Sequence, residues 1–197
     1  TYYPVSYSWN QGTWFTYDPL SNKTGNGAFL PNKSFTDTDF HDGLSNTLAM
    51  AETKTFQAMI LDTRQPGIVG AEPPSEPKFL LNYLIGGVFD SYGHTEWVKG
   101  ELHETGFTTT LPPNTNVFFI PPGLNRKKDI DYVSMRDGES STIPTYGAVS
   151  SRSYHSLGVN TLFMNGSVRF IKNGISKEVW RALGTRESND LSDLERY

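Results

Sequence analysis

The sequence predicts one α+β domain over residues 1–197, with a predominantly antiparallel sheet, two or three short helices and long loops. Apolar and polar residues alternate over several short stretches, and turn residues separate these stretches, which is typical of paired strands. Helix start and stop signals frame only short segments. A chain of this length can bury a sizeable core as a single domain.

The N-terminal part of the chain is rich in Tyr, Trp, Asn and Gly, and turn residues interrupt its β-propensity. We expect short strands near residues 5–9 and 13–17, and a helical turn at residues 37–40. The stretch 47–56 predicts a longer strand, because apolar residues recur there at alternate positions and would share one face of a sheet.

The middle of the chain gives weaker signals. Pro77 precedes the apolar run 79–85, and proline is tolerated in a first helical turn, so a short helix is expected there. Residues 95–99 and 145–150 have the composition of strands. The proline-rich stretch 111–126 predicts a long surface loop.

The clearest local signal is a hairpin within residues 154–186. Two alternating stretches, 159–164 and 167–171, flank the dipeptide Asn165-Gly166. This dipeptide tolerates the two successive positive φ angles of a type I′ turn, which is the two-residue turn that best suits the twist of a hairpin.

A short helix is expected directly after the hairpin. Ser176 can cap it, residues 177–183 would form it, and Gly184 can end it. Trp180 and Leu183 are three residues apart, so they would lie on one helix face and dock on the hairpin.

Composition limits the classes of function. The net charge of −4 gives no general electrostatic case for binding nucleic acid or an anionic membrane. An aromatic content of 13% with a charged content of 19% argues against a disordered chain. The absence of cysteine excludes disulfides, thiolate zinc sites and cysteine nucleophiles. No apolar run approaches the roughly 20 residues that a membrane span needs.

Two runs near the end of the chain carry a family resemblance. His155 begins H-S-L-G-V-N-T-L-F-M-N-G-S-V-R-F-I, and Trp180 begins W-R-A-L-G-T-R. These runs closely resemble the C-terminal signature of the bacterial prepilin-type, processing-associated H-x9-D-G proteins, a family also labelled a domain of unknown function or a solute-binding family. Leu157 replaces the family's first glycine, and Asn165 replaces its aspartate, which keeps the turn chemistry and loses the charge.

The resemblance extends along most of the chain. D-G-L-S-N-T at residues 42–47, followed by Glu52, is similar to another element of the family, as are G-H-T-E-W-V at 93–98 and T-G-F-T-T at 105–109. Several motifs in the same order make the match specific. The resemblance implies a structural role for the signature residues His155, Gly158, Asn160, Asn165, Gly166, Arg169, Trp180, Arg181 and Arg186.

The resemblance also implies a fold and a function. It implies a pilin- or pseudopilin-like globular domain that acts as a non-enzymatic structural or assembly subunit of a type II secretion or type IV pilus-like system. Its partners would be other pseudopilin-like subunits or secretion machinery, not nucleic acid. Family members carry an N-terminal helix that is absent from this sequence, so we expect an extracytoplasmic domain, in the periplasm or at the cell surface, that is tethered to the membrane only through such a helix.

The charged residues of the signature have expected partners. The His155 imidazole is expected to tie the hairpin to residues 150–153 or to the Asn165 turn. The arginines of this region pair well with carboxylates, so we expect them to clamp loops together through residues such as Glu52 or Glu178.

Metal sites are considered at two places, although no cofactor is required by the sequence. His94, Glu96 and His103 would form a two-histidine, one-carboxylate site for zinc if adjacent strands carried them, and a hydrogen-bonded structural cluster is the alternative. The oxygen-rich residues 187–193 offer ligands for calcium, with a frayed polar tail as the alternative.

A competing hypothesis is an extracytoplasmic module that binds a glycan or another small solute. Aromatic faces stack on apolar surfaces, so an aromatic-rich N-terminal part could line a carbohydrate groove, or alternatively serve as core. The residues considered are Tyr2, Tyr3, Tyr7, Trp9, Trp14 and Tyr17. No catalytic residues are assigned, because Ser45 lies outside a G-x-S-x-G motif and no nucleophile is identifiable by spacing.

Overall fold

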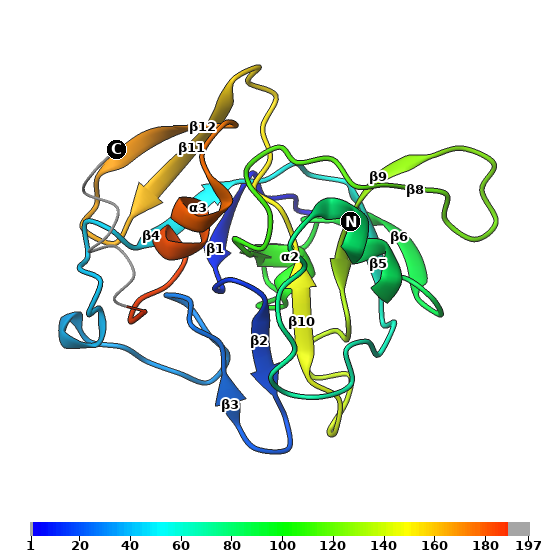
Figure 1. Ribbon diagram of the computed structural model, residues 1–197, viewed down its shortest axis with the longest axis horizontal. Coiled ribbons are helices and arrows are strands. Elements are labelled where there is room, and N and C mark those ends of the chain that lie inside the picture. The colour runs from blue at the N-terminus through cyan, green and yellow to red at the C-terminus, as the bar shows by residue number, and fades with distance from the viewer. Residues whose placement is uncertain (1, 189–197) are drawn as a thin grey trace.

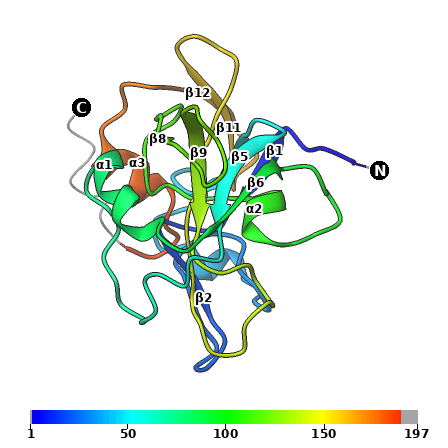
Figure 2. The ribbon, with the colours of Figure 1, turned by 90° about the vertical axis from the view of Figure 1, so that its right-hand side faces the viewer.

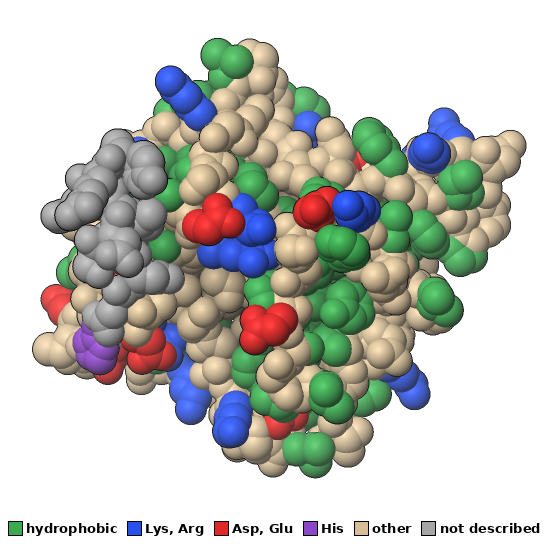
Figure 3. All heavy atoms as spheres, in the orientation of Figure 1, with side chains coloured by type: hydrophobic (Ala, Val, Ile, Leu, Met, Phe, Trp, Pro, Cys, Tyr) green, Lys and Arg blue, Asp and Glu red, His purple; other side chains and the backbone are tan. Residues whose placement is uncertain are grey.

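The computed structural model describes residues 2–188 and consists mainly of β-strands arranged in two mixed sheets (Figure 1). The five-stranded sheet lies on the left of this view and the seven-stranded sheet on the right. Figure 2 shows the right-hand side of the molecule as seen in Figure 1, with β9, β5 and β6 next to one another. On the face shown in Figure 3, acidic and basic side chains are interspersed, without an extended patch of one sign.

The five-stranded sheet combines strands from the N-terminal and C-terminal parts of the described chain. Its strands, in spatial order, are β12 (Val168–Lys172), β11 (Gly158–Phe163), β4 (Leu48–Glu52), β1 (Tyr7–Asn10) and β7 (Gly106–Phe107). β1 pairs antiparallel with β4 and parallel with β7, with Trp9 opposite Gly106. The signature hairpin thus adds its two strands to a sheet that the N-terminal segment begins.

The seven-stranded sheet is built from strands between residues 15 and 148. Its main path runs through β3 (Lys23–Thr24), β2 (Phe15–Asp18), β10 (Thr145–Ala148), β9 (Lys128–Val133), β5 (Gln57–Leu61) and β6 (Val88–Gly93), and β8 (Phe118–Phe119) pairs with β9. β5 pairs in parallel with β9 and antiparallel with β6.

Helices are few and short. They are α1 (Pro77–Leu80), α2 (Leu102–Thr105) and α3 (Lys177–Leu183), with single 3-10 turns at η1 (Asp37–Asp39) and η2 (Leu81–Tyr83). Together they make up 11% of the residues. α3 covers one face of the five-stranded sheet, and η1 buries none of its residues.

The fold class expected from the sequence is wrong. The structure is mostly strand in two mixed sheets, not a predominantly antiparallel α+β sheet of the pilin type, and each sheet contains a parallel pair. The physical reason is that local alternation indicates strands but not their direction of pairing. The parallel pairs join residues far apart in the chain, such as Ala58 with Ile130, so only the packed core decides their direction.

The signature hairpin and helix are confirmed as elements. α3 occupies residues 177–183, and the Ser176 Oγ accepts a hydrogen bond from the Val179 N–H at 3.2 Å. The turn type is wrong, because Asn165 is not among the residues with positive φ and only Gly166 has one, at +84°. The Gly166 N–H donates to the Phe163 carbonyl, which makes a type I turn followed by a left-handed glycine.

Other elements differ from expectation for identifiable reasons. The stretch 47–56 holds β4 and then a turn in which Phe56 has a φ of +56°. Residues 95–99 form no strand beyond an isolated bridge from Tyr3 to Glu96. β5 and β9 were missed because both of their faces are buried: Ile60 packs in one cluster, while Met59 and Leu61 pack in another.

Three buried clusters hold the fold. The first contains Trp14, Tyr132 and Tyr146 and lies between the seven-stranded sheet and the α1–η2 segment. The second contains Leu48, Phe107, Phe163 and Trp180 and lies between the five-stranded sheet and α3. The third consists of Met59, Leu61, Leu102, Val133 and Val149. Burial of such side chains contributes roughly 1.5–3 kcal/mol each, so these clusters dominate stability.

Arg152 joins the two sheets. Its backbone N–H donates to the Glu52 carbonyl of β4 at 2.7 Å, and its guanidinium contacts Asp131 at 2.8 Å and Asp129 at 2.7 Å on β9. Arg152 and Asp131 are almost fully buried. Burial raises the pKa of Asp131, and Arg152 opposes this by favouring the carboxylate.

We predict that Arg152→Met lowers the free energy of unfolding by about 3–5 kcal/mol, because it leaves the Asp131 carboxylate buried without its cation. Arg136→Met is the matched control. It breaks an ion pair with Asp62 of equal length, 2.8 Å, but Arg136 is half-exposed, so we expect a loss below about 1 kcal/mol. Urea denaturation measures both, and similar losses for the two variants would contradict the linking role.

Candidate functional site

The Glu52 carboxylate contacts the end of the signature hairpin that carries His155 and Asn160. It accepts hydrogen bonds from the Asn160 N–H at 2.6 Å and the Asn160 side chain at 3.2 Å. The His155 Nε2 lies 3.2 Å from it, and the Tyr7 hydroxyl donates to it at 3.5 Å. The His155 imidazole therefore contacts β4 rather than the Asn165 turn, and only the His155 main-chain N–H reaches residues 150–153, where it donates to the Ser153 hydroxyl at 3.1 Å. Its ring also meets Phe170 edge-on, with 6.1 Å between centroids.

These residues belong to one face of the five-stranded sheet, here called the outer face. Residues opposite one another in a ladder point to the same side, so the register places Tyr7, Glu52, Asn160 and Phe170 in one row. A second row contains Trp9, Met50, Leu162 and Val168. α3 covers the opposite face, so the outer face carries both the signature pair His155–Asn160 and several exposed apolar side chains.

The last part of the signature fastens α3 to the rest of the chain. Trp180 is fully buried against Phe107. Arg181 donates to the carbonyls of Thr110 and Pro74, and Arg186 donates to the carbonyls of Gly25 and Gly27.

The expectation that arginines clamp loops through carboxylates holds for Arg152, which pairs with Asp129 and Asp131, but it needs correction for Arg181 and Arg186. Backbone carbonyls, rather than Glu52 or Glu178, are the main partners of Arg181 and Arg186, and a neighbouring carboxylate, Glu187, adds one contact at 2.7 Å. These contacts hold α3 and the residues after it against neighbouring loops, which is a structural role.

The remaining signature residues shape the hairpin. The Asn165 Oδ1 accepts from the Ser167 N–H at 3.0 Å and from its hydroxyl, so an acceptor oxygen is what the turn uses at this position. Arg169 lies over the Phe163 ring at 4.1 Å and donates to the Ser45 carbonyl. The Gly158 carbonyl accepts from the Ser153 hydroxyl at 2.6 Å, which holds the start of β11.

His94 and His103 lie in a buried cluster with Glu104. The His94 Nδ1 is 3.0 Å from the Glu104 carbonyl, and its Nε2 has no hydrogen-bond partner among residues 2–188. The His103 Nδ1 is 3.4 Å from Glu101, and its Nε2 is 3.6 Å from Glu104. Burial lowers the pKa of both histidines to about 4 and raises the pKa of Glu101 and Glu104.

The three residues considered as metal ligands do not act as one set. The Glu96 carboxylate pairs with Lys99 at 2.9 Å, and Glu104, which the sequence did not single out, takes its place beside the histidines. The part of the chain that the structure describes contains no group of three or more His, Asp or Glu side chains arranged to hold a metal ion. Of the calcium candidate, residues 189–193 lie outside the described residues.

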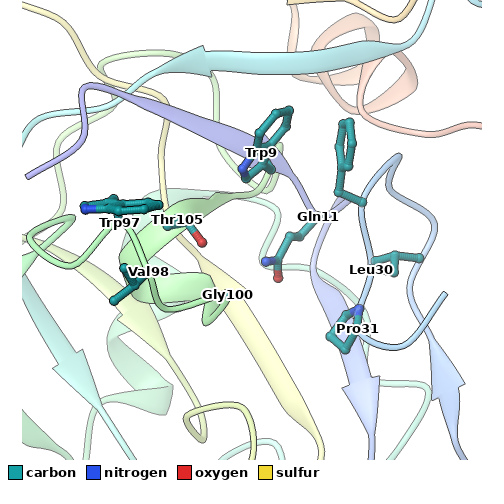
Figure 4. A pocket seen from close by; sticks show the side chains of 9 residues that line it. Trp9, Gln11, Leu30, Pro31, Trp97, Val98, Gly100 and Thr105 are labelled. Carbon is teal, nitrogen blue, oxygen red and sulfur yellow. The ribbon is translucent and has the colours of Figure 1, made fainter. Parts of the chain in front are cut away.

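A hollow of about 400 Å³ opens beside the outer face (Figure 4). It lies between Trp9 and Gln11 at the end of β1, residues 29–31, and the segment from Trp97 to Thr105. Figure 4 shows the Gln11 side chain pointing into it from β1. A volume of this size is within the range of small-molecule sites.

The sequence indicated only part of this hollow. Of the aromatic residues considered for a groove, Trp9 lines it, whereas Trp14 is buried in the core. Trp97 and Gln11 were missed as site residues. Their proximity depends on the parallel pairing of β1 with β7, which no local pattern reveals.

The fold and the site define a β-rich domain with an uncovered sheet face and a shallow, uncharged hollow beside it. No helix within residues 2–188 has the length and hydrophobicity that a membrane span requires. The chain belongs to the family described as a protein of unknown function (DUF1559), whose model, SBP_bac_10, matches residues 1–178. No curated protein and no solved structure matches the chain.

We predict that Gly184→Ala destabilises the protein by about 1–3 kcal/mol through overpacking. Gly184 has an ordinary φ of −80°, so its role is close approach: a Cβ there would lie 2.1 Å from the Thr109 Oγ1. Gly174→Ala is the control, because its Cβ would meet nothing within 4 Å, and we expect a change within about 0.5 kcal/mol. Thermal or urea unfolding compares them, and an equally stable Gly184→Ala protein would contradict this packing.

We predict that His94 and His103 stay neutral in the folded protein down to a pH of about 4. Unfolded histidines have a pKa of about 6.5, so between pH 6.5 and 4 the unfolded state binds more protons. The stability that these histidines contribute is complete above pH 6.5 and is lost as the pH falls toward 4, while Glu101 and Glu104 act in the opposite direction. Imidazole resonances followed by NMR test this, and titration of either ring near pH 6.5 would refute it.

Proposed function

We propose that this chain is the globular part of a non-enzymatic, extracytoplasmic, pseudopilin-like assembly subunit of a type II secretion or pilus-like system. The observation that supports this most strongly is the outer face of the five-stranded sheet. There, Val168 is 68% exposed, Phe170 47% and Trp9 41%. Contiguous exposed apolar side chains mark surfaces at which proteins associate.

The arrangement of the outer face fits a protein contact. An apolar row and a mixed row run side by side across four strands, so the surface is broad and has a regular shape. The mixed row places the Glu52–His155–Asn160 network beside Tyr7 and Phe170. Apolar and aromatic residues around a few fixed polar groups are typical of interface centres.

The Glu52 network also favours a positioning role over a catalytic one. Its carboxylate receives donors from β1 and β11, and its main-chain carbonyl accepts from Arg152 and Ser151. A carboxylate engaged by so many donors is held in one orientation. The contacts of Glu52 thus link neighbouring strands and support the shape of the outer face.

A second proposal is a module that binds a glycan or another small solute. One specific observation favours it, namely the hollow that contains Trp9, Gln11 and Trp97. The two proposals share Trp9 but otherwise use different residues, because the assembly surface centres on β12, whereas the hollow lies at the opposite edge of the sheet beside β7.

We predict that copies of this domain associate weakly in solution through the outer face, and that Val168→Asp with Phe170→Asp weakens this association about tenfold or more, because charges replace apolar contacts. Sedimentation equilibrium measures the association constant. Phe118→Asp with Ile120→Asp is the control, because these side chains are similarly exposed but lie on or next to β8.

The absence of cysteine allows an independent readout. Val168→Cys should give disulfide-linked dimers faster than Val88→Cys, which places a thiol on the exposed β6. A domain that remains monomeric at the highest concentration, or that responds equally to both pairs of aspartates, would refute assembly through this face.

A further inference from the structure

The hollow beside β1 has walls that are already in place. Its outer wall is the segment 97–105, and the Thr105 hydroxyl donates to the Lys99 carbonyl at 2.7 Å across the base of that segment. The Trp97 N–H donates to the Tyr3 carbonyl at 3.2 Å. A site whose walls are fixed before a ligand arrives loses little conformational entropy on binding.

Two indole rings border the hollow and remain open to solvent. Trp9 packs against Phe29 with 4.6 Å between ring centroids and is still 41% exposed. Trp97, which belongs to a different segment, is 61% exposed. Large aromatic surfaces of this kind offer flat platforms for an apolar ligand face.

Gln11 supplies an unused hydrogen-bonding group. The side chain is 5% exposed, and its Oε1 has no hydrogen-bond partner within the described part of the chain. Figure 4 shows its amide directed into the hollow. Buried polar groups are nearly always paired, so an unpaired side-chain oxygen on a residue that lines a hollow points to a partner from outside the chain.

The local packing keeps this amide in place. Gly106 on β7 faces Gln11, and a Cβ at that position would lie 2.7 Å from the Gln11 Nε2. Any larger residue there would displace the amide from the floor.

The hollow selects against charged ligands. None of its nine lining residues carries a formal charge. The nearby charges are engaged elsewhere: Lys99 pairs with Glu96 at 2.9 Å, and the Glu104 carboxylate accepts from the N–H groups of Thr95 and Glu96. An ion entering the hollow would lose hydration without gaining a counter-charge.

We infer that this hollow binds a neutral saccharide, whose pyranose ring stacks on Trp9 or Trp97 while a hydroxyl group bonds the Gln11 amide. Pyranoses with equatorial hydroxyl groups combine a flat apolar face with a rim of hydroxyls, which matches two platforms and one amide. This inference rests on the second proposal above and specifies its ligand class, and it stands whether or not the outer face mediates assembly.

The test uses two β-linked probes, cellohexaose and chitohexaose, and a decaproline peptide as the competing flat ligand. Binding is measured by calorimetry and by protection of tryptophan fluorescence from acrylamide. Trp14 and Trp180 are buried, so only Trp9 and Trp97 can report strongly. We expect at least one of the two oligosaccharides to bind and to protect the exposed indoles.

Three variants locate the site. Trp97→Ala should weaken binding about tenfold, and Gln11→Leu should weaken it without loss of the fluorescence response of Trp97. Tyr154→Ala removes an aromatic side chain that is 88% exposed and does not line the hollow, so it should leave affinity unchanged.

The inference is overturned if neither oligosaccharide binds at millimolar concentration, if decaproline binds in their place, or if Trp97→Ala and Tyr154→Ala behave alike. The Val168→Asp with Phe170→Asp protein separates the two proposals. Loss of association with intact oligosaccharide binding supports both, whereas loss of saccharide binding in that protein would contradict an independent site.

Discussion

The buried ion pairs of Arg152 hold the two sheets in one structure. The Arg152 main-chain N–H donates to the Glu52 carbonyl on β4 of one sheet, while its guanidinium contacts Asp129 and Asp131 on β9 of the other. A guanidinium in this position must stay paired, because a lone buried charge costs several kcal/mol. Glu52 extends the junction to the surface, since its carbonyl accepts from Arg152 and its carboxylate holds Asn160. The core and the outer face therefore depend on one another.

Sequence alone located those elements whose signals are local. α3 was predictable from the Ser176 cap and the apolar spacing that follows, and the hairpin from alternation on both sides of Gly166. β5 and β9 were not, because strands buried on both faces show no alternation. The parallel pairing of two-residue β7 with β1 carries no local signal, since only packing brings Trp9 opposite Gly106.

The candidate sites, too, were predictable from the sequence only where their residues lie close together in the chain. His155 and Asn160 stood out in the sequence, but their partner Glu52 lies 103 residues before His155 in the chain, and no spacing rule connects them. His94 and His103 do lie in one buried cluster, yet Glu104 joins them in place of Glu96, because a left-handed φ of +60° at His94 breaks the strand that would have aligned Glu96 with it. The sequence did not predict the hollow, because Trp9 and Trp97 belong to segments that are far apart in the chain and come together only on folding.

Gly106 limits which residues around the hollow can be substituted during evolution. The residues that set its width, such as Leu30, Pro31 and Val98, sit on connecting segments, where substitution leaves both sheets intact. Gly106 belongs to β7, and its missing side chain is the space in which the Gln11 amide lies. Related chains could therefore diversify the walls and alter which molecule fits, while the floor retains its hydrogen-bonding group. Such a division between a variable rim and a fixed base allows specificity to evolve without the loss of the scaffold.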